Sequence, residues 1–426
     1  MTWCLYADPV TTPDLTELAR RVRAASRSVA RAPGPVRDDA LRMAADLLEQ
    51  ESAAVLEANR GDLARAESGG MAASAQDRLR LSEGRISAMA AGLRGVATLA
   101  DPVGEVVDGW VRPNGLRVSR QRAPLGVVGV IYENRPNVTS DAAGLCLKAG
   151  NAAFLRGSAS ALASNQAIVG ILRRAVEKAG LPADAVALVE DTSHETAVAF
   201  MRLRGLIDCL IPRGGPALIA SLLENATVPY VLDGDGNCHV YIDAAADLSM
   251  ARDIVVNAKT HRFGVCNAAE TILVHAAVAG TFLPVVAAAL VVAGVELRGD
   301  ERVRAVVPGA GVASESDFAT EFLGPTVAVG VVDDLDGAIE HIARFGSGHS
   351  EAIVTTDVRA ADRFVAEVDA AAVLVNASTR FIDGEELGLG AEVGISTQKL
   401  HARGPMGVRE LTSVKWVVRG DGQVRQ

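Results

Sequence analysis

The sequence predicts a two-lobed α/β protein in which each lobe is a doubly wound, largely parallel sheet. Three observations predict it. Short apolar segments alternate with helical segments from residue 126, a second such series starts near residue 270, and no low-complexity stretch or linker separates them. The chain has 426 residues, 49% of them hydrophobic and 22% charged, which is enough for two or three domains with a sizeable core.

The N-terminal part, residues 14–99, predicts amphipathic helices. It is rich in Ala, Leu, Arg and Glu, its apolar residues recur every three or four positions, and it is broken at 33–35 and at 69–70 by Pro-Gly-Pro and Gly-Gly. Residues 101–126 then show β-branched alternation around a Pro-Asn-Gly turn. This pattern predicts a hairpin that protrudes from the helices.

The first strand–helix series predicts strands at 126–132 and 151–157, a helix between them that ends at Gly150, and a long helix at 159–180. It continues with AVALVE, a helix at 194–203, LIDCLIP, a helix from about residue 215, and VPYVL. Parallel sheets of this kind bind ligands at the carboxyl ends of their strands.

The second series includes strands at 323–332, 351–357 and 371–376. The break between the two series lies just before Cys266, which predicts that this thiol lies at the junction of the two lobes.

Charge and cysteine usage exclude several classes of protein. A net charge of -10 argues against a nucleic-acid partner or an anionic membrane surface, because both require a basic face. The cysteines have no CxxC pair or regular spacing, which predicts reduced thiols and neither a disulfide framework nor a metal site. They are Cys4, Cys146, Cys209, Cys238 and Cys266. The N-terminus lacks the features of a signal peptide and the longest apolar run, 283–295, is too short to span a bilayer, so a cytoplasmic location is expected.

Cys266 lies in RFGVCN, directly before an apolar segment. A cysteine that enters a strand is more often a small buried hydrophobe than a nucleophile. However, Lys259, His261 and Arg262 lie just upstream, and cations beside a thiol favour its reactive thiolate form. The residue pattern alone leaves both roles open. Cys146 and Cys209 fit a core role, and Cys238 is ambiguous.

Two turns of the first lobe have the composition of anion sites. LRGSAS (155–160) and IPRGGPALI (211–219) each place Gly and a basic residue between a strand and a helix N-terminus, although a tight turn alone would also need Gly. No GxGxxG is present. Polar residues also follow the strand at 126–132, and the polar, Gly-rich tail 376–411 favours a functional loop cluster over disorder.

Four segments together resemble a known family. They are VIYENRPNVTSDAAGLCLKAGNAAFLRGSAS, KTHRFGVCNAAETILVH, EFLGPT and NASTRF…GLGAEVGISTQKLHARGPMG. From about residue 15 to the C-terminus the chain is similar to the gamma-glutamyl phosphate reductases, also called glutamate-5-semialdehyde dehydrogenases, of the aldehyde dehydrogenase superfamily. The resemblance implies NADPH-dependent reduction of L-glutamyl 5-phosphate to L-glutamate 5-semialdehyde and phosphate through a cysteine thioester, the second step of proline synthesis from glutamate.

The resemblance also implies an aldehyde dehydrogenase-like fold with three parts. Residues 1–104 and 126–255 would form the NADP-binding domain, residues 256–403 the catalytic domain, and residues 105–125 with 404–426 a small β oligomerisation element. A homo-oligomer, dimer or tetramer, is expected, and a transient contact with glutamate 5-kinase is a further partner that the resemblance suggests.

By motif position, Cys266 would be the nucleophile, and the Asn134 amide with the Cys266 backbone N–H would stabilise the oxyanion. The residues expected to hold the cofactor are Arg156 and Ser158 at the adenosine ribose, Gly214 and Gly215 at the pyrophosphate, and Glu321 with Phe322 at the nicotinamide ribose. The candidates for the substrate phosphate and carboxylate are Arg135, Asn137, Lys259, Arg262 and Arg380. His239 is either an acid/base group or a structural histidine.

Some positions differ from the family pattern. Phe263 stands where Pro is usual and Ile382 where Thr is usual, which concerns substrate affinity and not the reaction. The stretch 231–239, VLDGDGNCH, lacks the glutamate with which hydrolytic aldehyde dehydrogenases activate water. Competing interpretations are an acyl-CoA-linked or hydrolytic aldehyde dehydrogenase, a thiol acyltransferase or amidohydrolase that uses Cys266 with His239 or His261, and a non-catalytic binding subunit.

Overall fold

The computed structural model describes residues 13–425, and the chain forms two compact units. The first unit comprises Met1–Leu232, Leu389–Gly394 and Met406–Gln426, and the second comprises Asp233–Gly388 and Ile395–Pro405. The sequence analysis set the boundary at 255/256, whereas the chain first passes into the second unit at Asp233. Cys4 lies outside the described residues.

The helical prediction for residues 14–99 is confirmed. The helices are α1 (Pro13–Arg31), α2 (Gly34–Gln50), α3 (Ser52–Ser68), α4 (Ala73–Leu79) and α5 (Glu83–Thr98), with breaks at both predicted sites. Helix α1 buries Leu15, Ala19 and Val22, whose spacing of three and four places them on one stripe. This stripe packs on the first sheet through Val127 and Phe154.

The first sheet has four parallel strands in the order β5-β4-β3-β6. The strands are β3 (Val127–Tyr132), β4 (Ala152–Arg156), β5 (Val186–Leu188) and β6 (Cys209–Arg213), and the helices between and after them are α6 (Asn137–Lys148), α7 (Leu162–Lys178), α8 (His194–Met201) and α9 (Pro216–Asn225). The strand order reverses between β3 and β6, so ligands are expected beyond the carboxyl ends of these two strands. The predicted strand VPYVL is reduced to one isolated bridge between Tyr230 and Leu210.

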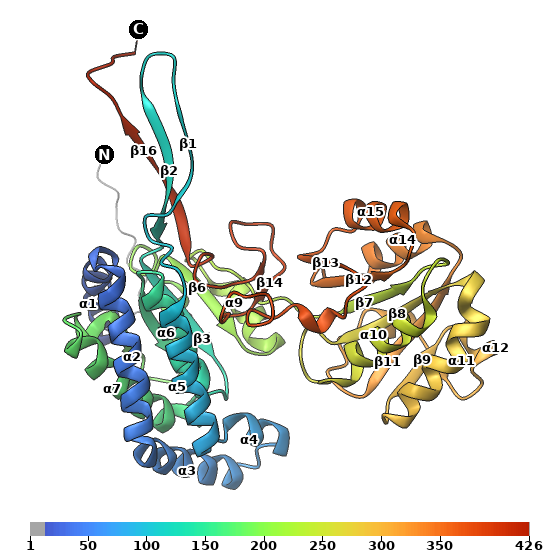
Figure 1. The fold of residues 1–426 in the computed structure, drawn as a ribbon. Helices are drawn as coiled ribbons and strands as arrows, with labels where there is room; N and C mark the ends of the chain where they lie inside the picture. Colours follow the sequence, from blue (N-terminus) through green and yellow to red (C-terminus); the bar gives the residue numbers. More distant parts are fainter. Residues whose placement is uncertain (1–12, 426) are drawn as a thin grey trace. The chain divides into compact units, whose positions relative to one another are not determined.

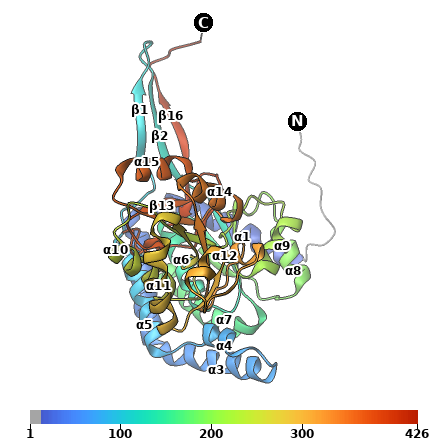
Figure 2. The same cartoon turned by 90° about the vertical axis from the view of Figure 1, so that its right-hand side faces the viewer.

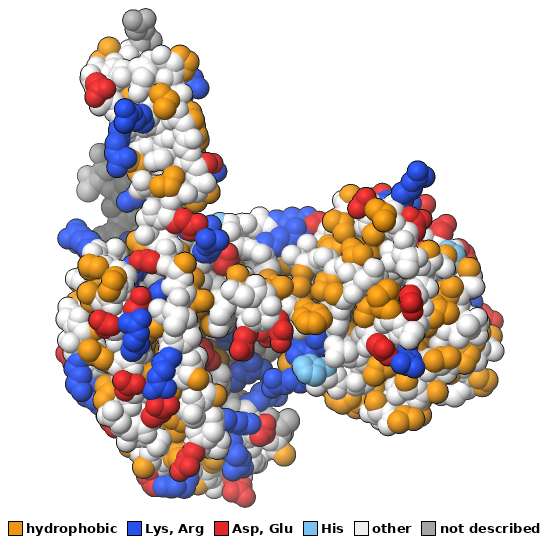
Figure 3. Space-filling view, in the orientation of Figure 1, with side chains coloured by type: hydrophobic (Ala, Val, Ile, Leu, Met, Phe, Trp, Pro, Cys, Tyr) orange, Lys and Arg blue, Asp and Glu red, His pale blue; other side chains and the backbone are white. Residues whose placement is uncertain are grey.

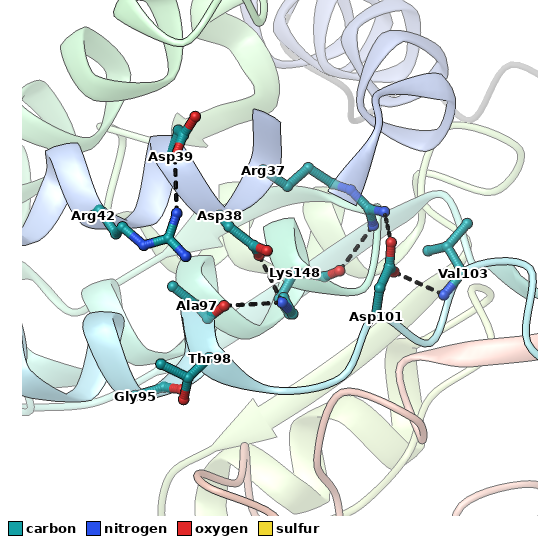
Figure 4. Close-up of polar contacts among 10 residues, drawn as sticks. All are labelled: Arg37, Asp38, Asp39, Arg42, Gly95, Ala97, Thr98, Asp101, Val103 and Lys148. Carbon is teal, nitrogen blue, oxygen red and sulfur yellow. Dashed lines mark hydrogen bonds and ion pairs between the residues drawn. The ribbon is translucent and has the colours of Figure 1, made fainter. Parts of the chain in front are cut away.

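Two buried cations join the helices of the first unit (Figure 4). The Arg37 guanidinium in α2 is 1% exposed and donates to the Lys148 carbonyl oxygen at 2.8 Å and to Asp101 Oδ2 at 2.6 Å. Lys148 Nζ, at the end of α6, donates to Asp38 Oδ1 at 2.6 Å and to the Ala97 carbonyl oxygen at 3.2 Å. These bonds fix the end of α6 and the segment that follows α5 against α2.

The predicted protruding hairpin is confirmed and acquires a third strand. Strands β1 (Val106–Val111) and β2 (Arg117–Pro124) pair antiparallel, and β16 (Thr412–Arg419) adds to β2 from the end of the chain. In both views this sheet extends away from the helices of its unit (Figure 1, Figure 2). Trp110 and Trp416 are 42% and 61% exposed with ring centroids 5.7 Å apart, and hydrophobic side chains lie along the sheet surface in Figure 3.

The second unit is built on a seven-stranded parallel sheet in the order β10-β9-β11-β8-β7-β12-β13. Its strands are β7 (Cys238–Ile242), β8 (Ala269–His275), β9 (Glu296–Gly299), β10 (Gly311–Val312), β11 (Thr326–Val332), β12 (Ser350–Val354) and β13 (Ala372–Val375). Its helices are α10 (Leu248–Thr260), α11 (Ala276–Val292), α12 (Glu301–Val306), α13 (Glu315–Phe318), α14 (Leu335–Phe345) and α15 (Val358–Glu367). A two-stranded pair, β14 (Ile395–Ser396) and β15 (Gly404–Pro405), completes it.

Strand β7 explains the early boundary. It pairs with β8 on one side and β12 on the other, and all five of its residues are buried, so it is central to the second sheet. None of the helices within residues 13–425 is both long and apolar enough to span a membrane.

Candidate active site

Cys266 lies in the loop between α10 and β8, at the amino end of the second sheet. Its side chain is half-buried. The Cys238 thiol, at the start of β7, donates to the Cys266 carbonyl oxygen at 3.1 Å. The neighbouring Gly236 tolerates no side chain, because a Cβ there would lie 1.6 Å from that same oxygen. The loop before β7 is therefore pressed onto the backbone of Cys266.

Arg380 is attached to the Cys266 loop through Asn267. The Asn267 side chain donates to the Ile382 carbonyl oxygen at 2.7 Å, and the Thr379 hydroxyl donates to the Asn267 carbonyl oxygen at 2.7 Å. Arg380 Nε in turn donates to His261 Nδ1 at 3.2 Å.

The electrostatics confirm that these groups are neighbours. Burial lowers the pKa of Arg380, Arg262 lowers it further, and Asp383 and Cys266 act in the opposite direction. The second unit thus gathers Arg262, Arg380 and Cys266, as the sequence analysis expected.

Glu321 and Phe322 lie in the loop before β11. Glu321 Oε1 accepts the N–H of Gly236 at 2.9 Å, so this loop also borders the backbone of Cys266. Burial raises the pKa of Glu321, and the nearby Asp235 and Asp233 add to this shift. The Phe322 ring lies 5.5 Å from the Arg298 guanidinium.

Two expected site residues are instead buried within the second unit. Lys259 is fully buried and pairs with Glu270, whose other carboxylate oxygen accepts the Leu323 N–H at 3.2 Å. His239 is fully buried in β7, and its Nδ1 lies 3.0 Å from Glu351 Oε2. Neither side chain has a surface to offer a substrate, so substrate binding by Lys259 and proton transfer by His239 both conflict with their burial.

In the first unit, polar residues line the carboxyl ends of neighbouring strands. Asn134 follows β3, and its side-chain oxygen accepts hydrogen bonds from Ser158 at 3.2 Å and from Ser160, both of which follow β4. Arg135 and Asn137 are exposed, and Asn137 Nδ2 donates to Asp141 Oδ2 at 3.0 Å.

The turns at the ends of β4 and β6 contain the basic residue and the glycines singled out in the sequence. Arg156 Nη2 donates to the carbonyl oxygens of Thr192 and Ser193, and its Nε is buried without a hydrogen-bond partner among residues 13–425. At the N-terminus of α9, the Glu133 carboxylate accepts the Gly215 N–H at 3.0 Å, which shows that this turn attracts an anion. A Cβ on Gly214 would lie 2.7 Å from Leu218 Cδ2 and 2.8 Å from the Glu133 carboxylate, so a larger residue here would displace the ends of these two side chains.

Sequence reasoning missed three residues of the site. Ser160 is part of LRGSAS but was not singled out, and only its bond to Asn134 reveals it. Gly236 was not singled out and the role of Cys238 was left ambiguous, because their contacts with Cys266 depend on the pairing of β7 with β8. Cys146 and Cys209 are buried, as predicted.

Known proteins share both the sequence and the fold of the chain. The sequence profile of the aldehyde dehydrogenase family matches residues 7–307 and 309–417. A gamma-glutamyl phosphate reductase of Moorella thermoacetica is 56% identical over 407 residues, covering 96% of this chain and 97% of the relative. One of Caldanaerobacter subterraneus is 52% identical over 408 residues, covering 96% and 99%. The crystal structure of the Thermotoga maritima gamma-glutamyl phosphate reductase superposes with a TM-score of 0.95 at 47% identity, covering 97% of this chain and 100% of that one.

These likenesses extend over almost the whole length of both partners, and they confirm the predicted aldehyde dehydrogenase-like α/β fold. The chain belongs to the aldehyde dehydrogenase family and, within it, to the gamma-glutamyl phosphate reductases.

Proposed function

We propose that the chain reduces L-glutamyl 5-phosphate to L-glutamate 5-semialdehyde and phosphate with NADPH, as the second step of proline biosynthesis from glutamate. The observation that carries the proposal is the half-buried Cys266 in a loop joined by hydrogen bonds to the segment of Arg380, within a chain 56% identical to a named reductase. A thiol beside cations is suited to attack an anionic acyl phosphate.

Cys266 is the proposed nucleophile. Its thiolate attacks the acyl carbon, the bond from that carbon to the phosphate oxygen breaks, and phosphate leaves with the bonding electrons, so a thioester remains on Cys266. The side-chain amide of Asn134 and the backbone N–H of Cys266 are the proposed donors to the oxyanion. Loss of one such donor typically lowers kcat by about a hundredfold or more.

Cofactor binding is assigned to both units. Arg156, Ser158, Gly214, Gly215, Glu321 and Phe322 would hold NADPH. When bound, the reduced nicotinamide supplies the hydride that converts the thioester to the semialdehyde level. The exposed or half-buried cations Arg135, Arg262 and Arg380, with Asn137, are the proposed partners of the substrate phosphate and carboxylate.

The domain assignment follows from these roles. The helices of residues 13–98 with the sheet β5-β4-β3-β6 are the proposed cofactor domain, the second unit is the proposed catalytic domain, and residues 105–125 with 404–426 are the proposed oligomerisation element. The exposed Trp110 and Trp416 support a dimer through this element. Deletion of 105–121 should leave a monomer by light scattering, and an unchanged mass would contradict the assignment. A cytoplasmic location and a transient contact with glutamate 5-kinase belong to the same proposal.

The deciding experiment is reduction of NADP⁺ with L-glutamate 5-semialdehyde, with and without phosphate, in wild type and Cys266→Ser. Activity that requires phosphate and is lost in the variant supports both the reaction and the nucleophile. Activity without phosphate would identify a hydrolytic aldehyde dehydrogenase, and activity that requires CoA would identify an acyl-CoA-linked one. Absence of activity with all three acceptors would contradict the proposal.

A further inference from the structure

Asn134 occupies an unusual backbone position directly after β3. Its φ of 44° lies in the left-handed region, which few residues other than glycine adopt and which Asn tolerates best among them. Strands β3 and β4 are paired with Ile131 opposite Arg156, so both end at the same edge. Asn134 and the serines that follow β4 therefore meet at this edge of the first sheet.

The two serines form a closed ring of hydrogen bonds with Asn134. The backbone N–H of Asn134 donates to Ser158 Oγ at 3.3 Å, Ser158 Oγ and Ser160 Oγ are 2.8 Å apart, and Ser160 Oγ donates to Asn134 Oδ1. Ser158 Oγ also lies 3.2 Å from Oδ1. The ring thus starts on the main chain of Asn134 and returns to its own side chain.

The ring contains the oxygen of the Asn134 amide, not its nitrogen. A backbone N–H can only donate, so Ser158 accepts there and passes its single proton on to Ser160 or to Oδ1. Ser160 then has its own proton for Oδ1. In the structure the side-chain atom that faces the serines is the amide oxygen, Oδ1, which is within hydrogen-bond reach of both hydroxyls. The Nδ2 group points away from them, and within residues 13–425 no acceptor is paired with it.

We propose that Ser160, together with Ser158, is a positioning residue that holds the Asn134 amide with its NH₂ group toward the acyl oxygen of the substrate. This inference rests on the proposed function, in which Asn134 donates to the oxyanion. An amide without these hydroxyls can turn and present Oδ1, which would repel the developing negative charge. Three hydroxyl and amide groups on two adjacent strands thereby preorganise one donor.

The test compares kcat and KM for the phosphate-dependent reaction in matched variants. Ser160→Ala should lower kcat by about tenfold with KM for the semialdehyde nearly unchanged. Ser158→Ala/Ser160→Ala, measured at saturating NADP⁺ because Ser158 is also assigned to the cofactor, should approach the loss of about a hundredfold typical of removing an oxyanion donor. Ser160→Thr, which keeps the hydroxyl, should restore kcat to within about twofold of wild type. Ser68→Ala is the control, because Ser68 is exposed at the end of α3 and bonds only the Ala64 carbonyl oxygen.

A double-mutant cycle separates positioning from a general structural role. If Ser160 acts through Asn134, Asn134→Ala/Ser160→Ala should be no slower than Asn134→Ala alone. Losses that multiply, or full kcat in Ser160→Ala, would overturn the proposal. If the wild type itself is inactive, the proposed function fails, and crystal structures of wild type and Ser158→Ala/Ser160→Ala still decide the positioning. An Asn134 amide that keeps the same rotamer without both hydroxyls would refute it.

Discussion

The buried guanidinium of Arg37 offers a direct test of what holds the first unit together. Replacing it by Met keeps the length of the apolar stem and removes the charge. The Lys148 carbonyl oxygen then loses a charged donor at 2.8 Å, in a place where Arg37 is 1% exposed and water has little access. Asp101 also loses its partner, but its side chain is 34% exposed and can be hydrated.

The expected loss follows from these two contacts. A buried acceptor left without a partner costs roughly 1–3 kcal/mol. The partly exposed ion pair to Asp101 adds at most about 1 kcal/mol. Arg37→Met should therefore reduce the free energy of unfolding by about 1–4 kcal/mol, whereas breaking a pair in which the remaining charge is also buried costs about 3–5 kcal/mol.

The assay is urea unfolding followed by the far-ultraviolet circular dichroism of the helices. Arg42→Met is the matched control, since Arg42 lies in the same helix and its pair with Asp39 leaves the two side chains 52% and 57% exposed. Arg42→Met should lower the free energy of unfolding by less than about 0.5 kcal/mol. Equal unfolding midpoints for Arg37→Met and Arg42→Met would refute the argument that burial makes the first pair important.

Three further outcomes are expected. Burial raises the pKa of Glu270 to about 7 even with Lys259 beside it, so Lys259→Met should raise this pKa further. Between about pH 7 and the raised pKa, the variant should lose stability relative to wild type by about 1.4 kcal/mol per pH unit in urea unfolding, whereas below about pH 6 the difference between the two should no longer change with pH. Glu133→Gln should tighten NADP⁺ binding about two- to fivefold by calorimetry, because a carboxylate no longer competes for the Gly215 N–H, and unchanged affinity would contradict this placement. Gly236→Ala should alter the rate at which iodoacetamide alkylates the Cys266 peptide, whereas Gly264→Ala, whose Cβ would meet nothing closer than 3.8 Å, should not.

Sequence periodicity predicted much of the fold because most elements present a regular apolar pattern. The helical character of residues 14–99 and the strands of the first sheet follow from it, whereas the breaks between α2 and α3 and between α4 and α5 were not predicted. Polar residues after β3, β4 and β6 could be placed by the rule that ligands bind at the carboxyl ends of strands. Strand β7 was missed. A central parallel strand is covered on both faces, so CHVYI shows no alternation that could identify it.

The site of the second unit was harder to predict for two reasons. Cys266 lies at the amino end of β8, and the rule that ligands bind at the carboxyl ends of strands does not apply there. Its neighbours come from loops that only the sheet order brings together. The burial of Lys259, in contrast, could have been predicted from the sequence. It continues the stripe of Ala251, Ile254, Val255 and Ala258, so the helical period alone places it on the covered face of α10. The burial of His239 could not have been predicted in this way, because its partner Glu351 lies on β12.

The position of β16 has a consequence for how the protein is made. Strand β2 pairs Pro124 with Thr412, so one edge of the hairpin lacks its partner until residues 412–419 emerge from the ribosome. At 5–20 residues per second, that interval is on the order of 15–60 s. Throughout it the nascent hairpin presents unpaired backbone groups and Trp110 to other chains, a configuration that favours edge-to-edge association. Residues 412–419, which are synthesised long after the hairpin, are thus the ones that close this edge.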